Sequence, residues 1–240
     1  MWQLGEVVET VTETTRTRSL VMTVPSWSRH QPGQHLDVRL TAEDGYQAIR
    51  SYSIASPPEA ENLELTIEQL PDGEVSPYLT EEVRVGDRLE VRGPIGGYFV
   101  WNAGMGGPVL LVAGGSGIVP LMAMIRHRVA VGSDVPIRLL YSARSPEDII
   151  YRAELERLSN SAPAFELRYT YTRSQPAGWT GYRRRVDQEM LREVAWPPLD
   201  RTLALTCGPT RFVETVASGL GNLGYGSERI RTERFGPTGG

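Results

Sequence analysis

Lysine is absent from the chain, and cysteine and histidine are scarce among its 240 residues. The single cysteine, Cys207, excludes an internal disulfide, a thiolate-held iron–sulfur cluster and a zinc-ribbon site within the chain. The three histidines, His30, His35 and His127, lack a spacing that places two of them on one helical face, so we expect no metal site. Every basic side chain is arginine, the better bidentate ligand for phosphate.

Long apolar runs and a strong net charge are also missing. No segment approaches the roughly 18 to 20 apolar residues that cross a bilayer, and no basic stretch leads into an apolar core after Met1. We therefore expect a cytoplasmic protein with no membrane partner. The formal charge of −4 argues against nucleic acid as a partner. The length leaves room for two domains of about 100 to 150 residues.

Short extended segments separated by turn residues fill the first hundred positions, a pattern typical of a small antiparallel barrel. Turns such as Pro32-Gly33 and Pro71-Asp72-Gly73 separate six expected strands. These strands are expected over residues 3–10, 19–24, 35–40, 50–55, 63–69 and 88–92. Residues 76–83 predict one short helix, with Ser76 as N-cap and Pro77 in its first position.

Strands alternate with helices after the glycine-rich stretch 102–108. Five strands are expected over residues 109–112, 137–142, 165–171, 202–206 and 230–233, and helices over 120–131, 151–158, 187–194 and 210–223. In the first helix, Leu121, Met124, Ile125 and Val129 share one face. The alternation predicts an open parallel sheet wound by helices. The fold class is thus an N-terminal six-stranded antiparallel barrel, residues 1–103, followed by a parallel α/β nucleotide-binding domain, residues 104–240.

Two motifs point to nucleotide chemistry. The sequence Gly114-Gly115-Ser116-Gly117 follows an apolar strand and opens a helix, so its backbone amides and the positive helix end suit a pyrophosphate. It matches neither the Gly-x-Gly-x-x-Gly fingerprint nor a Walker loop, and a tight packing turn is the alternative. In the strand Arg50-Ser51-Tyr52-Ser53, alternate side chains share a face, which places Arg50 for a phosphate beside the flat ring of Tyr52. A solvent-facing strand is the alternative there.

Five segments in this order resemble the ferredoxin–NADP reductase family of flavoproteins: Arg50-Ser51-Tyr52-Ser53-Ile54-Ala55, Gly73-Glu74-Val75-Ser76, Gly93-Pro94-Ile95-Gly96, Gly114 to Pro120, and Cys207-Gly208-Pro209. The resemblance covers nearly the whole chain. It implies that Arg50 binds the flavin phosphate, Tyr52 stacks on the isoalloxazine and Ser53 lies near N5, with Ser51 and Ile54 in the same segment. The second segment, Gly73, Glu74, Val75 and Ser76, would hold a pyrophosphate, which favours FAD over FMN.

The same resemblance assigns the nicotinamide side. Gly114, Gly115, Ser116, Gly117 and Pro120 would cradle the dinucleotide, and Cys207 would stand beside the reacting carbon, with Gly208 and Pro209 allowing close backbone approach. Glu233 would assist proton movement, and Phe235 would cover the flavin. The family's plastid members end in a tyrosine, so the extra segment 236–240 is a departure. For Cys207, a small buried hydrophobe is the alternative.

Coenzyme choice depends on groups near the ends of the second and third parallel strands. Ser142, Arg144 and Arg173 lie at these strand ends, and Arg183 follows shortly after in the run Arg183-Arg184-Arg185. These residues favour NADPH over NADH, as in bacterial members of the family. The alternative is that these arginines pair with surface carboxylates such as Glu147, Asp148 or Asp187.

We therefore expect an oxidoreductase that passes electrons from NADPH through FAD to a separate acceptor protein. That acceptor would be a ferredoxin or another haem, iron–sulfur or molybdenum protein, and Arg16, Arg18 and Arg29 would steer an acidic partner. A second hypothesis is an NADH-dependent reductase component of an oxygenase. A third, of another class, is a regulatory subunit that binds flavin and nucleotide without turnover.

Overall fold

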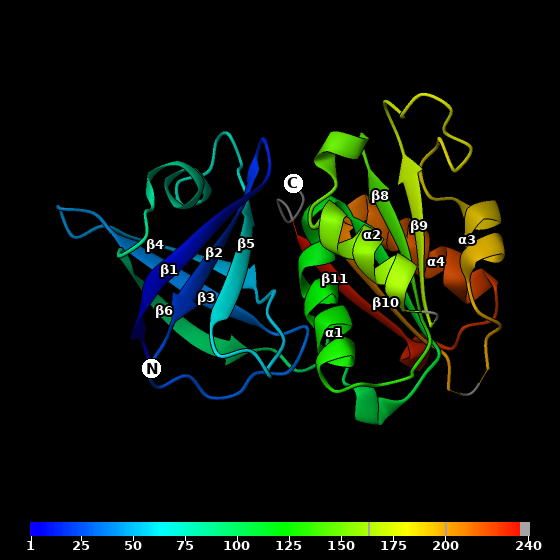
Figure 1. Ribbon diagram of the computed structural model, residues 1–240, viewed down its shortest axis with the longest axis horizontal. Coiled ribbons are helices and arrows are strands. Elements are labelled where there is room, and N and C mark those ends of the chain that lie inside the picture. Colours follow the sequence, from blue (N-terminus) through cyan, green and yellow to red (C-terminus); the bar gives the residue numbers. More distant parts are fainter. Residues whose placement is uncertain (163, 200, 236–240) are drawn as a thin grey trace.

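The computed structural model describes residues 1–162, 164–199 and 201–235, which form two layered halves placed side by side (Figure 1). The first half is a six-stranded antiparallel sheet in the order β4-β3-β6-β1-β2-β5. An antiparallel bridge between Ile54 and Leu65 joins its two outer strands, so the sheet closes into the predicted barrel. The strands are β1 (Gln3–Thr14), β2 (Thr17–Thr23), β3 (His35–Thr41), β4 (Gln47–Ser53), β5 (Leu63–Glu68) and β6 (Arg88–Ile95).

The short helix expected over residues 76–83 is a single π-helical turn, Tyr78–Glu82. The prediction that Ser76 caps it is wrong. The Ser76 hydroxyl instead accepts a hydrogen bond from the Leu70 amide at 3.0 Å, because the preceding loop folds back onto it. Two carbonyls at the helix, those of Thr80 and Val83, accept hydrogen bonds from the Arg18 guanidinium at 3.1 and 2.9 Å. Arg18 therefore supports this turn, and its predicted role in steering a partner stays a prediction.

The second half is a five-stranded parallel sheet in the order β11-β10-β7-β8-β9. Its strands are β7 (Val109–Gly114), β8 (Ile137–Ala143), β9 (Phe165–Tyr171), β10 (Leu203–Pro209) and β11 (Ile230–Phe235). Helices α1 (Ile118–Ala130) and α2 (Arg152–Ser161) cover one face, and α3 (Gln188–Val194) and α4 (Thr210–Asn222) cover the other. All six residues of β7 are buried, as a central parallel strand covered on both faces requires. The predicted fold class is confirmed.

Helix α1 lies between the parallel sheet and the barrel (Figure 1). Every side chain from Ile118 to Ile125 is therefore buried, rather than one face only. Val129, predicted to share the face of Leu121, Met124 and Ile125, is 48% exposed, although His127 in the same last turn still contacts Glu59 and Ala103 of the first half. The glycine-rich stretch 102–108 is packed rather than loose, since the Trp101 indole is fully buried and donates to the Gly106 carbonyl at 3.0 Å. A boundary between residues 103 and 104 stays a prediction.

Candidate functional site

The predicted flavin segment occupies the end of β4, at the rim of the barrel. Arg50 and Tyr52 pair across the sheet with Val38 and Leu36, both of which lie in the barrel core. Because cross-strand partners point to the same side, Arg50 and Tyr52 share a face. Burial raises the pKa of the Tyr52 hydroxyl to about 12, so the ring is a neutral aromatic surface at all ordinary pH values. Ser51 faces the other way and donates to Asp37 at 2.7 Å.

The second predicted flavin segment meets the first. The Arg50 guanidinium donates to the Glu74 carboxylate at 2.9 Å, and both side chains are about half exposed. Val75 is buried in the barrel core, which anchors the loop between Gly73 and the π-helical turn. The Ser76 hydroxyl, an acceptor for Leu70, still has its proton to donate. The two segments thus lie together, as a single cofactor-binding site would require.

The glycine loop after β7 packs against the end of β10 through bare backbone. A Cβ atom on Gly117 would overlap the Cys207 carbonyl and come within 2.8 Å of the Gly208 amide nitrogen. Gly115 has a φ of +56°, a conformation that side chains disfavour. The Phe212 ring lies against both Gly114 and Gly208, where added Cβ atoms would be 2.9 and 2.8 Å from it. The loop is therefore both a packing turn and a set of amides at the start of α1.

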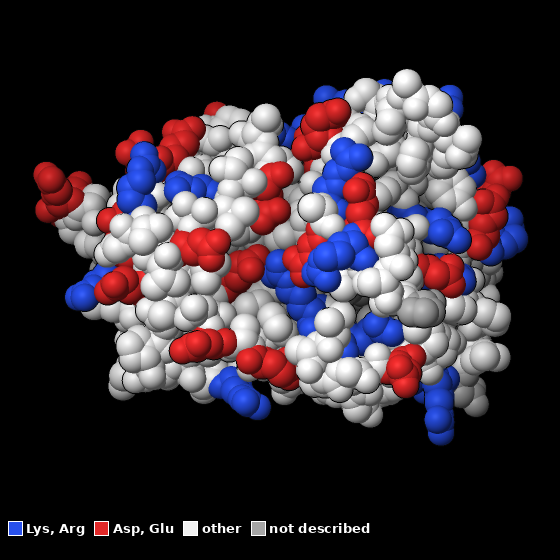
Figure 2. Space-filling view, in the orientation of Figure 1, with Lys and Arg blue, Asp and Glu red and all other residues white. Residues whose placement is uncertain are grey.

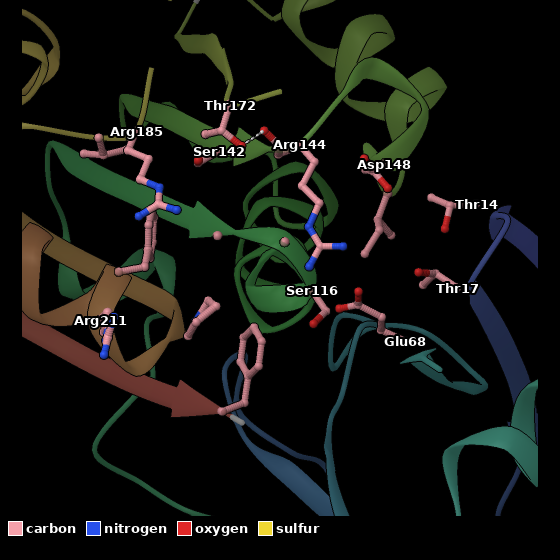
Figure 3. Close-up of a pocket in the computed structure, with 18 of the residues that line it drawn as sticks. Thr14, Thr17, Glu68, Ser116, Ser142, Arg144, Asp148, Thr172, Arg185 and Arg211 are labelled. Carbon is pink, nitrogen blue, oxygen red and sulfur yellow. Dashed lines mark hydrogen bonds between the residues drawn. The ribbon is translucent and has the colours of Figure 1, made fainter. Parts of the chain in front are cut away.

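A pocket of about 490 Å³ opens at the carboxyl ends of the parallel strands (Figure 3). Seven predicted site residues line it: Gly114, Gly115, Ser116, Ser142, Arg144, Pro209 and Phe235. The barrel supplies the facing wall, through Thr14 and Thr17 of the β1–β2 hairpin, Arg16 between them, and Glu68 of β5. The pocket therefore lies between the two halves, as ligand sites often do at the switch point of an α/β sheet.

Some predicted residues do not reach this pocket. Gly117, Pro120, Cys207 and Gly208 are buried and are not among the lining residues. Arg173 is not among the lining residues, and Arg183 lines a different hollow and donates to the Trp179 carbonyl. The segment 236–240 lies outside the described residues.

Besides Arg16, which pairs with Glu68 at 3.3 Å, three arginines line the pocket: the predicted Arg144, together with Arg185 and Arg211. Within the described part of the chain, none of the three guanidinium groups takes part in an ion pair. The neighbouring Arg184 is the one that pairs with Asp187, at 2.5 Å. Unpaired guanidinium groups beside a loop of backbone amides suit the phosphates of a dinucleotide.

Sequence reasoning missed Arg185, Arg211 and Phe212 in this wall. Arg185 ends the run of arginines in which Arg183 was chosen instead. Arg211 and Phe212 follow Cys207-Gly208-Pro209 in the first turn of α4, so their place after a strand end was the available signal. The sequence patterns did not indicate which of these side chains face the pocket.

Cys207 and Glu233 are neighbours on adjacent strands β10 and β11. The Cys207 thiol donates a weak hydrogen bond to the Glu233 carboxylate at 3.8 Å. Burial, with the nearby carboxylate, raises the pKa of the thiol well above its usual value, so it is uncharged. Burial also raises the pKa of Glu233 to about 7, and this carboxyl group can therefore gain or lose a proton near neutrality. Two residues on, Phe235 borders the pocket.

The described residues contain neither a membrane-spanning helix nor a metal-binding cluster. Among the described helices, none combines the length and the apolarity that a membrane crossing requires. Within the same residues, no group of three or more histidine, cysteine, aspartate or glutamate side chains is arranged to hold a metal ion.

A closed antiparallel barrel with an Arg-x-Tyr-Ser strand, joined to a parallel sheet with a glycine loop, defines the class of flavin- and nicotinamide-binding oxidoreductases. The model of the oxidoreductase FAD-binding domain matches residues 5–100, and that of the oxidoreductase NAD-binding domain matches residues 111–218. The chain belongs to the ferredoxin–NADP reductase-like family of FAD- and NAD-binding oxidoreductases.

Individual relatives agree with this placement. A glycine betaine monooxygenase reductase subunit of Chromohalobacter salexigens is 35% identical over 87% of this chain and 56% of its own length. The NADH-cytochrome b5 reductase 1 of Aspergillus terreus is 34% identical over 82% of this chain and 68% of its own. A ferredoxin NADP⁺ reductase from Neisseria gonorrhoeae, solved with FAD and NADP, shares the fold with a TM-score of 0.83 at 20% identity, covering 97% of this chain and 98% of that one. The chain thus spans little more than half the length of the monooxygenase reductase subunits.

Proposed function

We propose that this chain is an FAD-dependent reductase that oxidises NAD(P)H and passes electrons to a separate acceptor, as the reductase part of an oxygenase system. The pocket between the halves carries the proposal, because it combines a glycine loop with three arginines that have no ion pair among the described residues. The glycine betaine monooxygenase reductase subunits, at 35 to 36% identity, favour an oxygenase over a ferredoxin as the acceptor. Residues 1–103 would hold the flavin and 104–240 the nicotinamide nucleotide.

Bound FAD supplies the chemistry, accepting hydride from the nicotinamide and releasing electrons singly. The protein would bind the flavin and the nicotinamide nucleotide and orient them. Arg50 and the Gly73–Ser76 loop would hold the flavin phosphates, and Tyr52 would provide a flat surface for the ring. The amides of Gly114 to Gly117 would hold the nucleotide diphosphate. The Cys207–Glu233 pair would hold a proton at the strand ends, where Glu233 has a pKa of about 7.

Anaerobic titration of the purified protein with NADPH and NADH tests this function. We expect a yellow protein whose flavin absorbance is bleached by at least one nucleotide, and then restored by an oxidised acceptor protein. A flavin spectrum that neither nucleotide changes would contradict the reductase and support the non-catalytic binding subunit. A preparation that stays colourless after incubation with FAD would contradict both.

For the coenzyme, the arginines favour NADPH, whereas the NADH named in the b5 reductase relatives favours the alternative. If NADPH is the coenzyme, Arg144→Gln should raise the KM for NADPH by about 10-fold, because one charge-assisted contact to phosphate is lost. The KM for NADH should stay unchanged. Arg173→Gln is the matched control, because Arg173 follows the adjacent strand but does not line the pocket. If the parent enzyme prefers NADH, the proposed coenzyme becomes NADH and the reductase proposal still stands.

A further inference from the structure

Arg126 is a buried arginine on the third turn of α1, the helix that starts directly after the glycine loop. Its side chain is only 16% exposed. It binds the Glu154 carboxylate of α2 with two donors, Nε at 3.1 Å and Nη2 at 2.7 Å. These two hydrogen bonds to Glu154 lie within the α/β half of the molecule and fix the plane of the guanidinium group.

The remaining hydrogen bonds of Arg126 reach the barrel. Nη1 of Arg126 donates to the Ala55 carbonyl at 3.1 Å and to the Glu64 carboxylate at 2.9 Å. Ala55 is the last residue of the predicted flavin segment Arg50–Ala55, and its amide donates to the Glu64 carbonyl at 2.8 Å, where the barrel closes. One guanidinium group therefore connects the helix of the glycine loop to the strand end of the flavin segment.

Tyr151, at the start of α2, adds a second polar link beside the first. The Arg126 guanidinium lies over its ring at 4.8 Å. The Tyr151 amide donates to the Glu13 carboxylate of the barrel at 3.2 Å, and its hydroxyl donates to Thr66. Tyr151 adopts a φ of +58°, the only described non-glycine residue with a positive φ. A tyrosine in this unfavourable conformation indicates that the surrounding contacts fix its position.

The remaining interface is largely apolar. Ala55, Phe99 and Trp101 from the first half of the chain belong to the same buried cluster as the side chains of α1. Apolar contact is non-directional, so it holds two surfaces together without selecting one register between them. The directional contacts of Arg126 supply that register. In Figure 2, basic side chains lie in the seam between the two halves, with acidic ones on either side.

We propose that Arg126 is a positioning residue, which fixes how far the flavin strand lies from the glycine loop and so sets the approach of nicotinamide to flavin. This rests on the proposed function, because hydride transfer requires the two rings at near-contact distance. Displacing reacting groups by about 1 Å can cost on the order of 100-fold in rate. Arg126 itself touches neither ring in this account and acts through Ala55, Glu64 and α1.

The test compares Arg126→Lys with Arg138→Lys. Arg138 makes a matching set of contacts inside the α/β half alone: two donors to Glu166 at 3.0 and 2.7 Å, one to the Val194 carbonyl at 2.7 Å, and a guanidinium over the Trp196 ring at 3.8 Å. Its side chain is 17% exposed, against 16% for Arg126. Lysine keeps the charge in both variants but loses the planar fork.

Three readouts on the FAD-loaded proteins are expected to separate the two variants. In Arg126→Lys, the rate of flavin reduction by NAD(P)H falls by roughly 10- to 100-fold, while the Kd of the oxidised nucleotide and FAD retention stay within twofold of the parent. The long-wavelength charge-transfer absorbance of the flavin–nicotinamide pair weakens. Hydrogen exchange accelerates at the Tyr151 amide, whose acceptor lies in the other half. Arg138→Lys keeps the parent values in all three.

Glu64→Gln is a second variant, in case Arg126→Lys folds poorly. It leaves the Glu154 contact and the charge of Arg126 in place and weakens only the link to the barrel. A slower reduction with unchanged nucleotide Kd is again expected. Parent-like reduction and parent-like Tyr151 exchange in both variants would overturn the positioning role. Failure of the reductase function would differ, because the parent protein itself would then show no flavin reduction.

Discussion

At the scale of single residues, the contact between the glycine loop and β10 leaves no room for a side chain at Gly117. Gly117→Ala places a Cβ against the Cys207 carbonyl and the Gly208 amide, which are backbone atoms and cannot rotate away. We expect a loss of about 1–3 kcal/mol in the free energy of unfolding, measured by urea titration. Gly221→Ala is the control: open space surrounds this helical glycine, so a small gain of about 0.5 kcal/mol is expected. Equal stability of the two variants would contradict the close approach.

Glu233 makes stability depend on pH in a direction opposite to that of an ion-paired carboxylate. Burial raises its pKa from 4.5 to about 7 in the folded protein, so the folded state holds the proton more tightly than the unfolded chain. Well below pH 4.5 both states are protonated and the group contributes nothing. Between pH 4.5 and 7 the unfolded chain releases the proton first, so folded stability falls as pH rises, and the full cost remains above pH 7.

Glu233→Gln removes this cost because the amide cannot ionise. We expect its free energy of unfolding to exceed that of the parent by on the order of 2 kcal/mol at pH 8, with almost no difference at about pH 3.5, roughly one unit below the unfolded pKa. Urea titrations of both proteins at the two pH values measure the effect. The exposed Glu228→Gln, five residues earlier, provides the control and should match the parent at both. A difference of the same size at both pH values would point to packing rather than ionisation.

At the scale of elements, the π-helical turn is held by one arginine from another strand. Arg18→Gln leaves the Thr80 and Val83 carbonyls without their charged donor. We expect a loss of about 1.5–3 kcal/mol in the free energy of unfolding. Because the turn follows the Gly73–Ser76 segment, FAD should also dissociate more readily, which dialysis followed by an absorbance spectrum measures. Arg29→Gln, at an exposed position, should leave both unchanged. If FAD retention is equal in the two variants, the turn does not support the flavin segment.

The sequence predicted the elements well because their signals are local. Turn residues separate the six barrel strands, and β7 shows the continuous apolar run of a doubly covered strand. The predictions that failed concern side chains for which several neighbouring contacts were available. The Ser76 hydroxyl had both the helix amides and the Leu70 amide in reach, and the loop geometry decided for Leu70. Val129 fits the helical period, but which side chains of the last turn of α1 are covered depends on the packing of distant segments.

At the scale of the whole molecule, the site lies where two separately predicted domains meet. Each motif could be assigned to its own half from sequence. The wall formed by Thr14, Arg16, Thr17 and Glu68 could not, because none of these residues belongs to a motif and their place depends on how the barrel sits against α1. The interface that sets this placement combines apolar packing with the Arg126 and Tyr151 contacts. Residues that act across it are therefore the ones that sequence patterns overlook.

Trp101 tests whether the two halves are one cooperative unit. Its indole is fully buried in the cluster that includes α1, and its Nε1 donates to the Gly106 carbonyl at 3.0 Å. Because removing it creates a cavity at the joint itself, Trp101→Ala should cost about 3–5 kcal/mol. Calorimetry should show one transition for the parent and a single transition roughly 10 °C lower for the variant.

Trp179→Ala is the matched control for that measurement. Trp179 also donates through Nε1 at 3.0 Å, to the Tyr182 carbonyl, but it is only partly buried and packs on the α/β half. A smaller cavity away from the joint should therefore lower the transition temperature by much less than Trp101→Ala does. If the parent itself unfolds in two separate transitions, the halves are independent, and Trp101 then stabilises one of them alone. A single transition that both variants shift equally would mean that burial at the joint contributes no more than burial elsewhere.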